Sequence, residues 1–358
     1  MSGMPTVKDS DFVDGSALLN VLREEFSAKD GMIFDAHGDA WIVWKTSELY
    51  AWWHSFEDQC SVPLQRKLMN ACADQEEYLL SLNQTLSTGW LLRKRKQKSA
   101  LDQRWARYGW GLIDLEHDVL QTLIFAPMAS GVALATKEQH THERLKLEWQ
   151  QASQRTISLE FTSAPSNLAP APAAPQMPWS TEHQQGFTTP QFLEELEWLN
   201  ATWTVGGEPT CLFPMDAFTR LFHTCRAYPS AVSKEQQMAW LTPAFDAGIR
   251  SVFLMVVASM ATLVNVGERP IYIENTSSWA SLSAHYLSPN GWGHPLSVES
   301  LGTEHGVRFV LSSGPTLPFL TGWLVAMWER GHGKSSKFTL KKSEHQWSLE
   351  VDSRLAYN

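Results

Sequence analysis

Two short stretches, Tyr108-Gly109-Trp110-Gly111 and Asn290-Gly291-Trp292-Gly293, place a tryptophan between two glycines once in each half of the chain. Each stretch is followed by an apolar run and a proline, and each half closes on a similar strand, residues 157–161 and residues 347–351. Self-similarity at a long period indicates repeated structural units. We therefore expect an internal duplication that gives two related domains.

The two Gly-Trp-Gly elements are best interpreted as structural. Glycines allow the backbone to adopt a positive φ or to approach a neighbouring segment closely, while the indole between them fills a hole in the core. Such an element would fix the entry of a strand onto the preceding helices. A ligand that stacks on Trp110 or Trp292 is the alternative that the pattern leaves open.

The chain has 358 residues, which is more than one hydrophobic core usually accommodates, so two domains are expected. Residues 162–190 are rich in proline, alanine, serine and glutamine. Such a composition sustains neither a helix nor a strand ladder and is typical of an extended, semi-rigid spacer. We predict an N-terminal α+β domain at 1–161, a linker at 162–190 and a C-terminal α+β domain at 191–358.

Hydrophobic periodicity and turn residues predict the elements of both domains. In the first half we expect helices at 16–28, 46–56, 62–82 and 91–108, a hairpin with strands at 32–34 and 40–44, and mostly strands from the first Gly-Trp-Gly element to 161. In the second half we expect helices at 191–202, 216–228, 234–264 with a break near Pro243, 277–287 and 317–330. The strands expected there are 271–274, 307–311, 338–342 and 347–351. Helices followed mostly by strands in each half predict an α+β fold with helices packed on an antiparallel sheet.

The composition excludes some classes of protein. A formal net charge of −9 at pH 7 argues against a nucleic-acid-binding protein, because contacts with phosphates need an excess of Lys and Arg. The 17 tryptophans favour packed interfaces, since a large indole is stable where its ring is covered. Extensive self-association is therefore expected.

No targeting or membrane segment is predicted. Residues 1–12 carry charges and no apolar stretch, which argues against an ordinary secretion signal. The longest apolar run, residues 252–264, is shorter than the ~20 residues of a membrane span and is expected to be a core helix. The four cysteines form no close pair, which fits a reducing, cytoplasmic setting without a zinc finger; they are Cys60, Cys72, Cys211 and Cys225.

Three polar patterns resemble functional motifs. Asp35-x-His37-x-Asp39 has the alternation of metal ligands on a strand, although the flanking strands predict a polar hairpin turn around Gly38. His140 and His142 offer two imidazoles without a third ligand, and we expect a solvated loop there. Residues 331–335 imitate the end of a phosphate-binding loop but follow a helix, so they are expected to end that helix.

One basic run stands out in this acidic chain. Its members are Arg93, Lys94, Arg95, Lys96 and Lys98, extended by Arg104 and Arg107. Such a run can hold an anionic partner, such as a nucleotide, an acidic protein face or a lipid headgroup, or can simply be a solvated helix surface. The sequence contains no Gly-x-Ser-x-Gly motif, and Cys225 near His223 has no evident orienting partner.

The order helix, Gly-Trp-Gly, strand, proline turn, apolar helix and closing strands resembles two bacterial families. One comprises small ligand-binding domains of the four-vinyl reductase type, and the other is the cellulose synthase D subunit. The second half carries the resemblance better, in Gly291-Trp292-Gly293, residues 309–315 and residues 319–324. The resemblance covers about the last third of each half.

The two resemblances imply different activities. The vinyl-reductase type implies binding or sensing of small hydrophobic molecules, and many of its members carry cysteines near the closing strands. Residues 144–161 and 337–351 contain no cysteine, and this departure argues against a cofactor or metal. The D subunit implies a non-catalytic, oligomeric helper of cellulose export, of which a tandem chain would be a pseudo-dimer.

We therefore expect a cytoplasmic, non-enzymatic structural or assembly protein, without a cofactor, that contacts itself and other protein components in bacterial exopolysaccharide (cellulose) synthesis or export. The residues expected at an interface or a ligand are Trp110, Trp292, Trp323 and Trp328. A small-molecule sensor with an apolar pocket in one or both domains is the alternative. A degenerate metal hydrolase built on Asp35, His37 and Asp39 is a third possibility.

Overall fold

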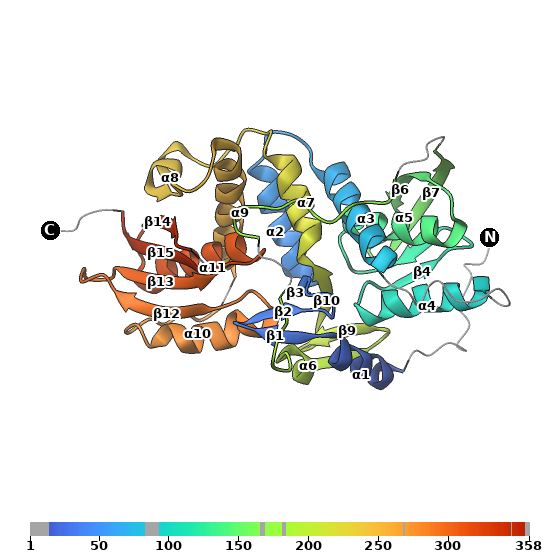
Figure 1. Ribbon diagram of the computed structural model, residues 1–358, viewed down its shortest axis with the longest axis horizontal. Helices are drawn as coiled ribbons and strands as arrows, with labels where there is room; N and C mark the ends of the chain where they lie inside the picture. The colour runs from blue at the N-terminus through green and yellow to red at the C-terminus, as the bar shows by residue number, and fades with distance from the viewer. Residues whose placement is uncertain are drawn as a thin grey trace.

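The two halves of the chain meet in a central sheet, seen in the computed structural model, which describes residues 14–82, 93–164, 169–180, 184–267, 269–344 and 346–354. The strand order of this sheet is β1-β2-β3-β10-β9-β8. The first half supplies β1 (Ser27–Lys29), β2 (Met32–Phe34) and β3 (Ala40–Lys45), and the second half supplies β8 (Leu196–Leu199), β9 (Thr202–Val205) and β10 (Glu208–Pro214). The expected α+β class is confirmed, because almost entirely antiparallel sheets pack against helices (Figure 1), while the internal duplication stays a prediction.

The junction of the central sheet is symmetrical. β3 and β10 run antiparallel, with Val43 opposite Leu212 near the middle of the pairing. On either side of this pair, Lys45 lies opposite Thr210 and Trp41 lies opposite Pro214. Each half contributes three consecutive antiparallel strands to the sheet. The backbone hydrogen bonds between β3 and β10 join the two halves.

Each half also forms a sheet of its own at one end of the molecule. In the first wing the order is β4-β5-β7-β6, and in the second wing it is β12-β13-β15-β14, with β11 (Trp240–Leu241) added beside β14. The first wing contains β4 (Leu112–Asp114), β5 (Val119–Gln121), α5 (Ala126–Thr141), β6 (Leu145–Gln151) and β7 (Thr156–Ser163). The second contains β12 (Pro295–Ser300), β13 (Val307–Ser312), α11 (Leu317–His332), β14 (Ser336–Lys342) and β15 (Gln346–Ser353). The wings lie at opposite ends of the long axis (Figure 1).

Long helices connect the halves. They are α2 (Thr46–Asp58) and α3 (Gln65–Leu82) in the first half, and α7 (Met215–Cys225) and α9 (Ala247–Val266) in the second. α2 of the first half packs on α9 of the second, and α7 of the second half packs on α3 of the first. The halves are therefore interlocked, since each sends a helix from the central sheet into the wing of the other.

The remaining helices border these layers. They are α1 (Gly15–Glu25), α4 (Arg93–Arg107), α6 (Phe192–Glu195), α8 (Lys234–Ala239), α10 (Ser278–Tyr286) and the 3-10 turn η2 (Ser288–Asn290). The side chain of Asp14 caps α1 by accepting from the Ser16 backbone N–H, and Asp246 caps α9 through the backbone N–H of Ile249. Such caps satisfy donors that the first turn of a helix leaves free.

Several sequence predictions are wrong in detail. The predicted helix at 191–202 is instead α6 followed by the hairpin of β8 and β9, in which Asn200 and Ala201 both adopt positive φ. Pairing with β10 in the central sheet outweighs the helical spacing of its apolar residues. The first wing contains the helix α5 where mostly strands were expected, residues 271–274 form no strand, and β12 was not predicted.

The proline-rich segment lies along the molecule, and several contacts hold it there. Arg220 donates to the carbonyl of Pro172 at 2.5 Å, and the backbone N–H of Ala171 donates to Glu77. Trp179 is fully buried, with its ring centroid 5.4 Å from that of Phe245. The segment is extended as expected, and residues on both sides of it share the central sheet, while the domain boundary drawn from the sequence stays a prediction.

The apolar run at 252–264 lies in α9, as expected. By length and composition alone α9 is the one helix in the described part of the chain that is able to cross a membrane, but 67% of its apolar window is buried inside the fold. It packs between α2 and α11. α9 is therefore the core helix that the sequence predicts.

Candidate functional site

The two Gly-Trp-Gly elements occupy equivalent places in the fold. A Cβ atom added at Gly109 would lie 2.7 Å from the carbonyl oxygen of Thr210 in β10, and one added at Gly291 would lie 2.8 Å from the carbonyl oxygen of Trp41 in β3. Both glycines have positive φ, +71° and +82°. Each element therefore docks on the central strand of the opposite half, so closely that only glycine fits.

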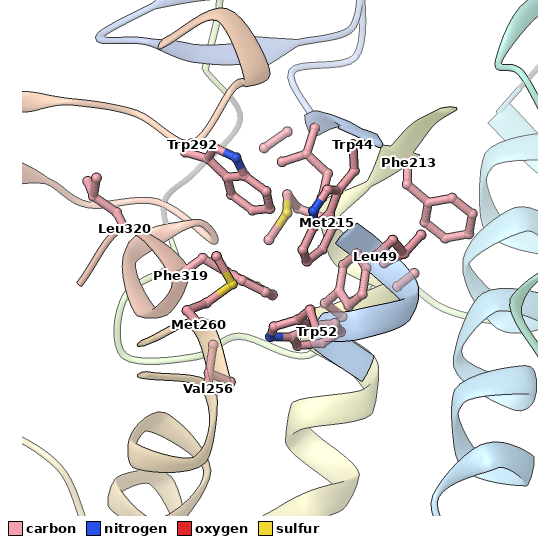
Figure 2. Packing of buried hydrophobic residues seen from close by; sticks show 14 of the residues in the cluster. Trp44, Leu49, Trp52, Phe213, Met215, Val256, Met260, Trp292, Phe319 and Leu320 are labelled. Atoms are coloured by element: carbon pink, nitrogen blue, oxygen red, sulfur yellow. The ribbon is translucent and has the colours of Figure 1, made fainter. Parts of the chain in front are cut away.

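The tryptophans of these elements seal the contact between the halves. The indole N–H of Trp110 donates to the carbonyl of Leu212 at 2.8 Å. Trp292 meets Trp44 edge to face at 4.7 Å between ring centroids, and Phe319 lies 5.3 Å away (Figure 2). Both indoles are buried, so neither presents a face to an external ligand or partner.

Trp323 and Trp328 of α11 are buried as well. The guanidinium of Arg269 lies 4.9 Å from the centroid of Trp323, and the indole N–H of Trp328 donates to the carbonyl of His305 at 2.8 Å. All four tryptophans predicted at an interface therefore pack inside the chain. In particular, the rings of Trp110 and Trp292 lie between its two halves.

The Asp35-x-His37-x-Asp39 pattern forms the hairpin turn between β2 and β3. One carboxylate oxygen of Asp35 accepts the backbone N–H groups of His37 and Asp39, at 2.9 and 3.0 Å, and the other accepts the indole N–H of Trp41 at 2.9 Å. Gly38 has φ +82°. Both oxygens of Asp35 thus hold the turn together, and the described residues contain no cluster of three metal-ligating side chains.

The other two motif-like patterns end helices. His140 lies in the last turn of α5, and His142 ends that helix in a left-handed conformation. The two imidazoles therefore do not share a strand face. Gly333 has φ +62° and its N–H donates to the carbonyl of Glu329 at 2.8 Å, which confirms the expected stop of α11.

The basic run forms α4, at the end of the first wing (Figure 1). Arg95 and Lys96 are exposed and make no ion pair with the described residues, whereas Lys98 pairs with Asp102 at 3.4 Å. The side chains of Arg93 and Lys94 lie outside the described residues. The candidate anion-binding surface on the described part of α4 therefore comprises Arg95, Lys96 and the partly neutralised Lys98.

Further along α4 the basic residues turn inward. Arg104 binds Glu76 through two hydrogen bonds of 2.6 and 2.8 Å, and Arg107 pairs with Glu25 at 3.4 Å. Burial raises the pKa of Glu76, and the paired guanidinium opposes that rise. The buried pair of Arg104 and Glu76 anchors α4 to α3, and the partly exposed pair of Arg107 and Glu25 joins α4 to α1.

An open groove of about 530 Å³ lies between α10 and β12 in the second wing. Its walls combine apolar side chains with hydroxyl groups and one imidazole, and no charged side chain. The lining residues are Thr276, Ser277, Trp279, Ala280, Ser283, Ala284, Ser288, His294, Pro295, Leu296, Ser297 and Val298. We call this the α10 groove.

Two polar side chains of the α10 groove stand out. Ser283 is 5% exposed, and its buried Oγ has no hydrogen-bond partner among the described residues. His294 Nδ1 lies 3.0 Å from Ser288 Oγ, and burial lowers the pKa of His294 while Asp30 opposes that shift. Burial therefore favours the neutral form of the His294 imidazole. The sequence interpretation missed this groove, for which the serines of α10 and the nearby His294 were the available signal.

A second surface feature, which we call the β11 patch, lies where α8 leads into β11. Met238 is 71% exposed and Leu241 is 46% exposed, and both border a hollow of about 340 Å³. Charged residues of both signs surround it and are paired within the chain, such as Lys337 with Asp352 and Arg354 with Glu235. The patch is therefore apolar with little net charge.

Comparison with known proteins finds no counterpart. No family model, no curated protein and no solved structure matches the chain. The resemblance to vinyl-reductase-type domains and to the cellulose synthase D subunit stays a prediction from the sequence.

Proposed function

We propose that the chain is a non-enzymatic structural protein that acts in an assembly as a single-chain pseudo-dimer. The observation that carries the proposal is the interlocking of the halves through the β3–β10 pairing and the exchanged helices α2 and α7. Backbone pairing and buried aromatic rings on both sides of the junction resist relative movement of the wings. A body of this kind holds two surfaces at a fixed separation, which is what an assembly component requires.

The two ends of this body offer different surfaces. The first wing carries the exposed basic side chains Arg95 and Lys96 on α4, which suit an acidic partner. The second wing carries the β11 patch, where exposed Met238 and Leu241 suit an apolar contact. We propose that a second copy of the chain binds the β11 patch, because the mixed and internally paired charges around it do not repel an identical surface.

Light scattering coupled to size-exclusion chromatography tests self-association. The wild-type chain should have a mass above that of the 40.4 kDa monomer and should dissociate on dilution. The double substitution Met238→Lys and Leu241→Lys should give the monomer mass, because two charges replace the apolar contact. A matched control, Val266→Lys with Tyr272→Lys, changes two residues that are also exposed but lie elsewhere. A wild-type monomer at every concentration overturns the proposed self-association.

The exopolysaccharide setting rests on the sequence resemblance alone. Co-purification of the tagged wild-type chain with cellulose synthase subunits from its parent organism tests that setting. The wild-type chain should retain these subunits, and the Arg95→Glu and Lys96→Glu variant should retain less if they bind the basic end. If the wild-type chain retains none of these subunits, the exopolysaccharide setting is wrong. The proposed self-association is then still tested by light scattering.

A further inference from the structure

We infer that the α10 groove is a binding site for a small neutral molecule that combines an apolar body with a hydrogen-bonding group. Its volume of about 530 Å³ lies in the range of small-molecule sites, roughly 300–1,000 Å³. This inference does not depend on the proposed assembly role, because the groove shares no lining residue with the β11 patch and none with α4.

The unpaired hydroxyl of Ser283 points to a polar group on the ligand. The side chain is buried in the groove wall, and its Oγ finds no partner among the described residues. A buried hydroxyl without a partner costs free energy, and native proteins generally satisfy such groups. A ligand that donates to or accepts from Ser283 Oγ would remove this cost.

The first half has an apolar residue, Leu101, at the same distance from its Gly-Trp-Gly element as Ser283 in the second half. Leu101 and Ser283 each precede the first glycine of their Gly-Trp-Gly element by eight residues. Leu101 is fully buried in an apolar cluster with Leu80 and Ala135. At the same distance from its glycine, the second half therefore carries a buried hydroxyl in α10 where the first half carries a buried leucine in α4.

The strand that forms the opposite wall is irregular at the groove. In the pairing of β12 with β13, Pro295 lies opposite Leu311 and Ser297 lies opposite Val310, so Leu296 is an extra, bulged residue. Bulges redirect side chains and are common beside functional sites. The bulge occurs within the stretch of β12 that lines the groove, and the corresponding strand β4 of the first wing pairs with β5 without a shift.

The lining determines the class of ligand. No Asp, Glu, Lys or Arg side chain lines the groove, so a charged ligand would lose its hydration without gaining an opposite charge. Burial lowers the pKa of His294 and so favours the neutral imidazole, and of its two ring nitrogens only Nδ1 has a hydrogen-bond partner among the described residues. Ser283 at one side and His294 at the other provide two polar contacts around an apolar centre.

Methyl NMR of the full chain tests the site directly. The methyl groups of Ala280, Ala284 and Leu296 line the groove and report on its occupation. We would titrate the labelled protein with benzyl alcohol, and with benzoate and benzylammonium as anionic and cationic probes of similar size. Benzyl alcohol should shift these signals in a saturable manner, with an affinity at least fivefold higher than that of either charged probe.

Three variants separate binding from folding. Ser283→Leu introduces the residue of the first wing and should abolish the shifts by filling the groove, while Ser283→Ala should weaken binding about fivefold, as expected for the loss of one hydrogen bond. Ser281→Ala changes an exposed serine of α10 that does not line the groove and should leave binding unchanged. If no neutral probe binds, if the charged probes bind equally well, or if Ser283→Leu and Ser283→Ala both bind like the wild type, the inference is wrong.

Discussion

The two wings have the same framework but differ on their outer surfaces. Their sheets share one strand order, with a helix between the second and third strands, and each is preceded by a Gly-Trp-Gly element that docks on the opposite half. The differences lie in the segment before that element, which is the basic helix α4 in the first wing and the serine-containing helix α10 in the second. The two wings therefore share their sheets and the docking of their Gly-Trp-Gly elements, and they differ in the helices at their outer surfaces.

Individual positions make the contrast concrete. Arg104 and Tyr286 each precede the first glycine of their element by five residues. Arg104 forms a buried ion pair with Glu76, whereas Tyr286 donates to the carbonyl of Pro270 near the surface. The first wing thus uses a buried charge pair to anchor its outer helix, and the second wing leaves a groove beside its own.

The largest expected effect concerns this buried pair. Arg104→Met leaves the carboxylate of Glu76 buried without its counter-ion, which should lower the free energy of unfolding by about 3–5 kcal/mol. Chemical denaturation measures the loss. The double variant Arg104→Met and Glu76→Leu should recover most of it, because no uncompensated charge remains.

The second wing provides the control for that prediction. Tyr286→Phe removes a hydroxyl that lies near the surface and should change the free energy of unfolding by no more than about 0.5 kcal/mol. A cost for Arg104→Met as small as that of Tyr286→Phe would contradict the view that the two wings anchor their outer helices differently.

Alanine at Gly109 or Gly291 tests the equivalence of the two elements. Both substitutions place a Cβ against a carbonyl oxygen in a strand of the opposite half and impose a positive φ on alanine. We expect each to lower the free energy of unfolding by about 2–4 kcal/mol, by similar amounts. Thermal and chemical denaturation measure both.

Gly207→Ala is the matched control for backbone strain. Gly207 has φ +78°, but a Cβ there would have no heavy atom within 4 Å, so only the strain of about 1–2 kcal/mol remains. Equal losses at Gly109, Gly291 and Gly207 would show that the close approach between the halves contributes nothing.

A smaller effect is expected from His294, which stands where the first wing has Leu112, three residues after the first glycine of each element. Burial lowers the pKa of His294 in the folded chain, so the unfolded chain binds the proton at a higher pH than the folded chain does. The neutral imidazole therefore contributes its full share to the free energy of unfolding above the ordinary pKa of 6.5. This contribution is lost as the pH falls below that value.

The variant His294→Leu should therefore lose less stability than the wild type between pH 7.5 and pH 5, measured by denaturation at each pH. His332, whose pKa is also lowered by burial, is present in both proteins, so its contribution cancels in the difference. Parallel pH profiles would refute the contribution of His294.

The smallest effect on stability is expected at the basic end. Arg95→Ala with Lys96→Ala removes exposed charges without an ion pair among the described residues and should change the free energy of unfolding by no more than about 0.5 kcal/mol. The same variant should elute from a heparin column at lower salt than the wild type. The control variant, Lys234→Ala with Lys337→Ala, removes two exposed charges from the second half and should elute at the same salt concentration as the wild type. If the wild type and both variants elute at the same salt concentration, α4 does not contribute to anion binding.

The sequence predicts much of the framework because the relevant signals are local. Turn residues and alternating strands define the β2–β3 hairpin around Asp35 and Gly38, and helical spacing defines α3, α9 and α11. The sequence also predicts that the two Gly-Trp-Gly elements serve a structural purpose. The helix expected at 191–202 is wrong because its apolar spacing fits both periods, and the sheet formed with a distant strand decides between them.

The candidate sites were less predictable, because they depend on contacts between residues that are distant in the sequence. The apolar character of Trp323 and Trp328 is visible in the sequence, but the covering of their rings from within the chain depends on Arg269 and His305. The α10 groove requires α10 and the bulged strand β12 to lie side by side, and β12 was not predicted.

The amino-acid order by itself determined the α+β class and the structural character of the two Gly-Trp-Gly elements, because these follow from backbone freedom and short-range periodicity. Only the tertiary structure decided that the halves interlock and that Trp110 and Trp292 are buried between them. It also decided that the proline-rich segment is held against α3 and α7 through Glu77 and Arg220. The physical reason is that β3 and β10 complete one another's hydrogen bonds between positions far apart in the sequence, from Lys45 opposite Thr210 to Trp41 opposite Pro214, a pairing that no local pattern encodes.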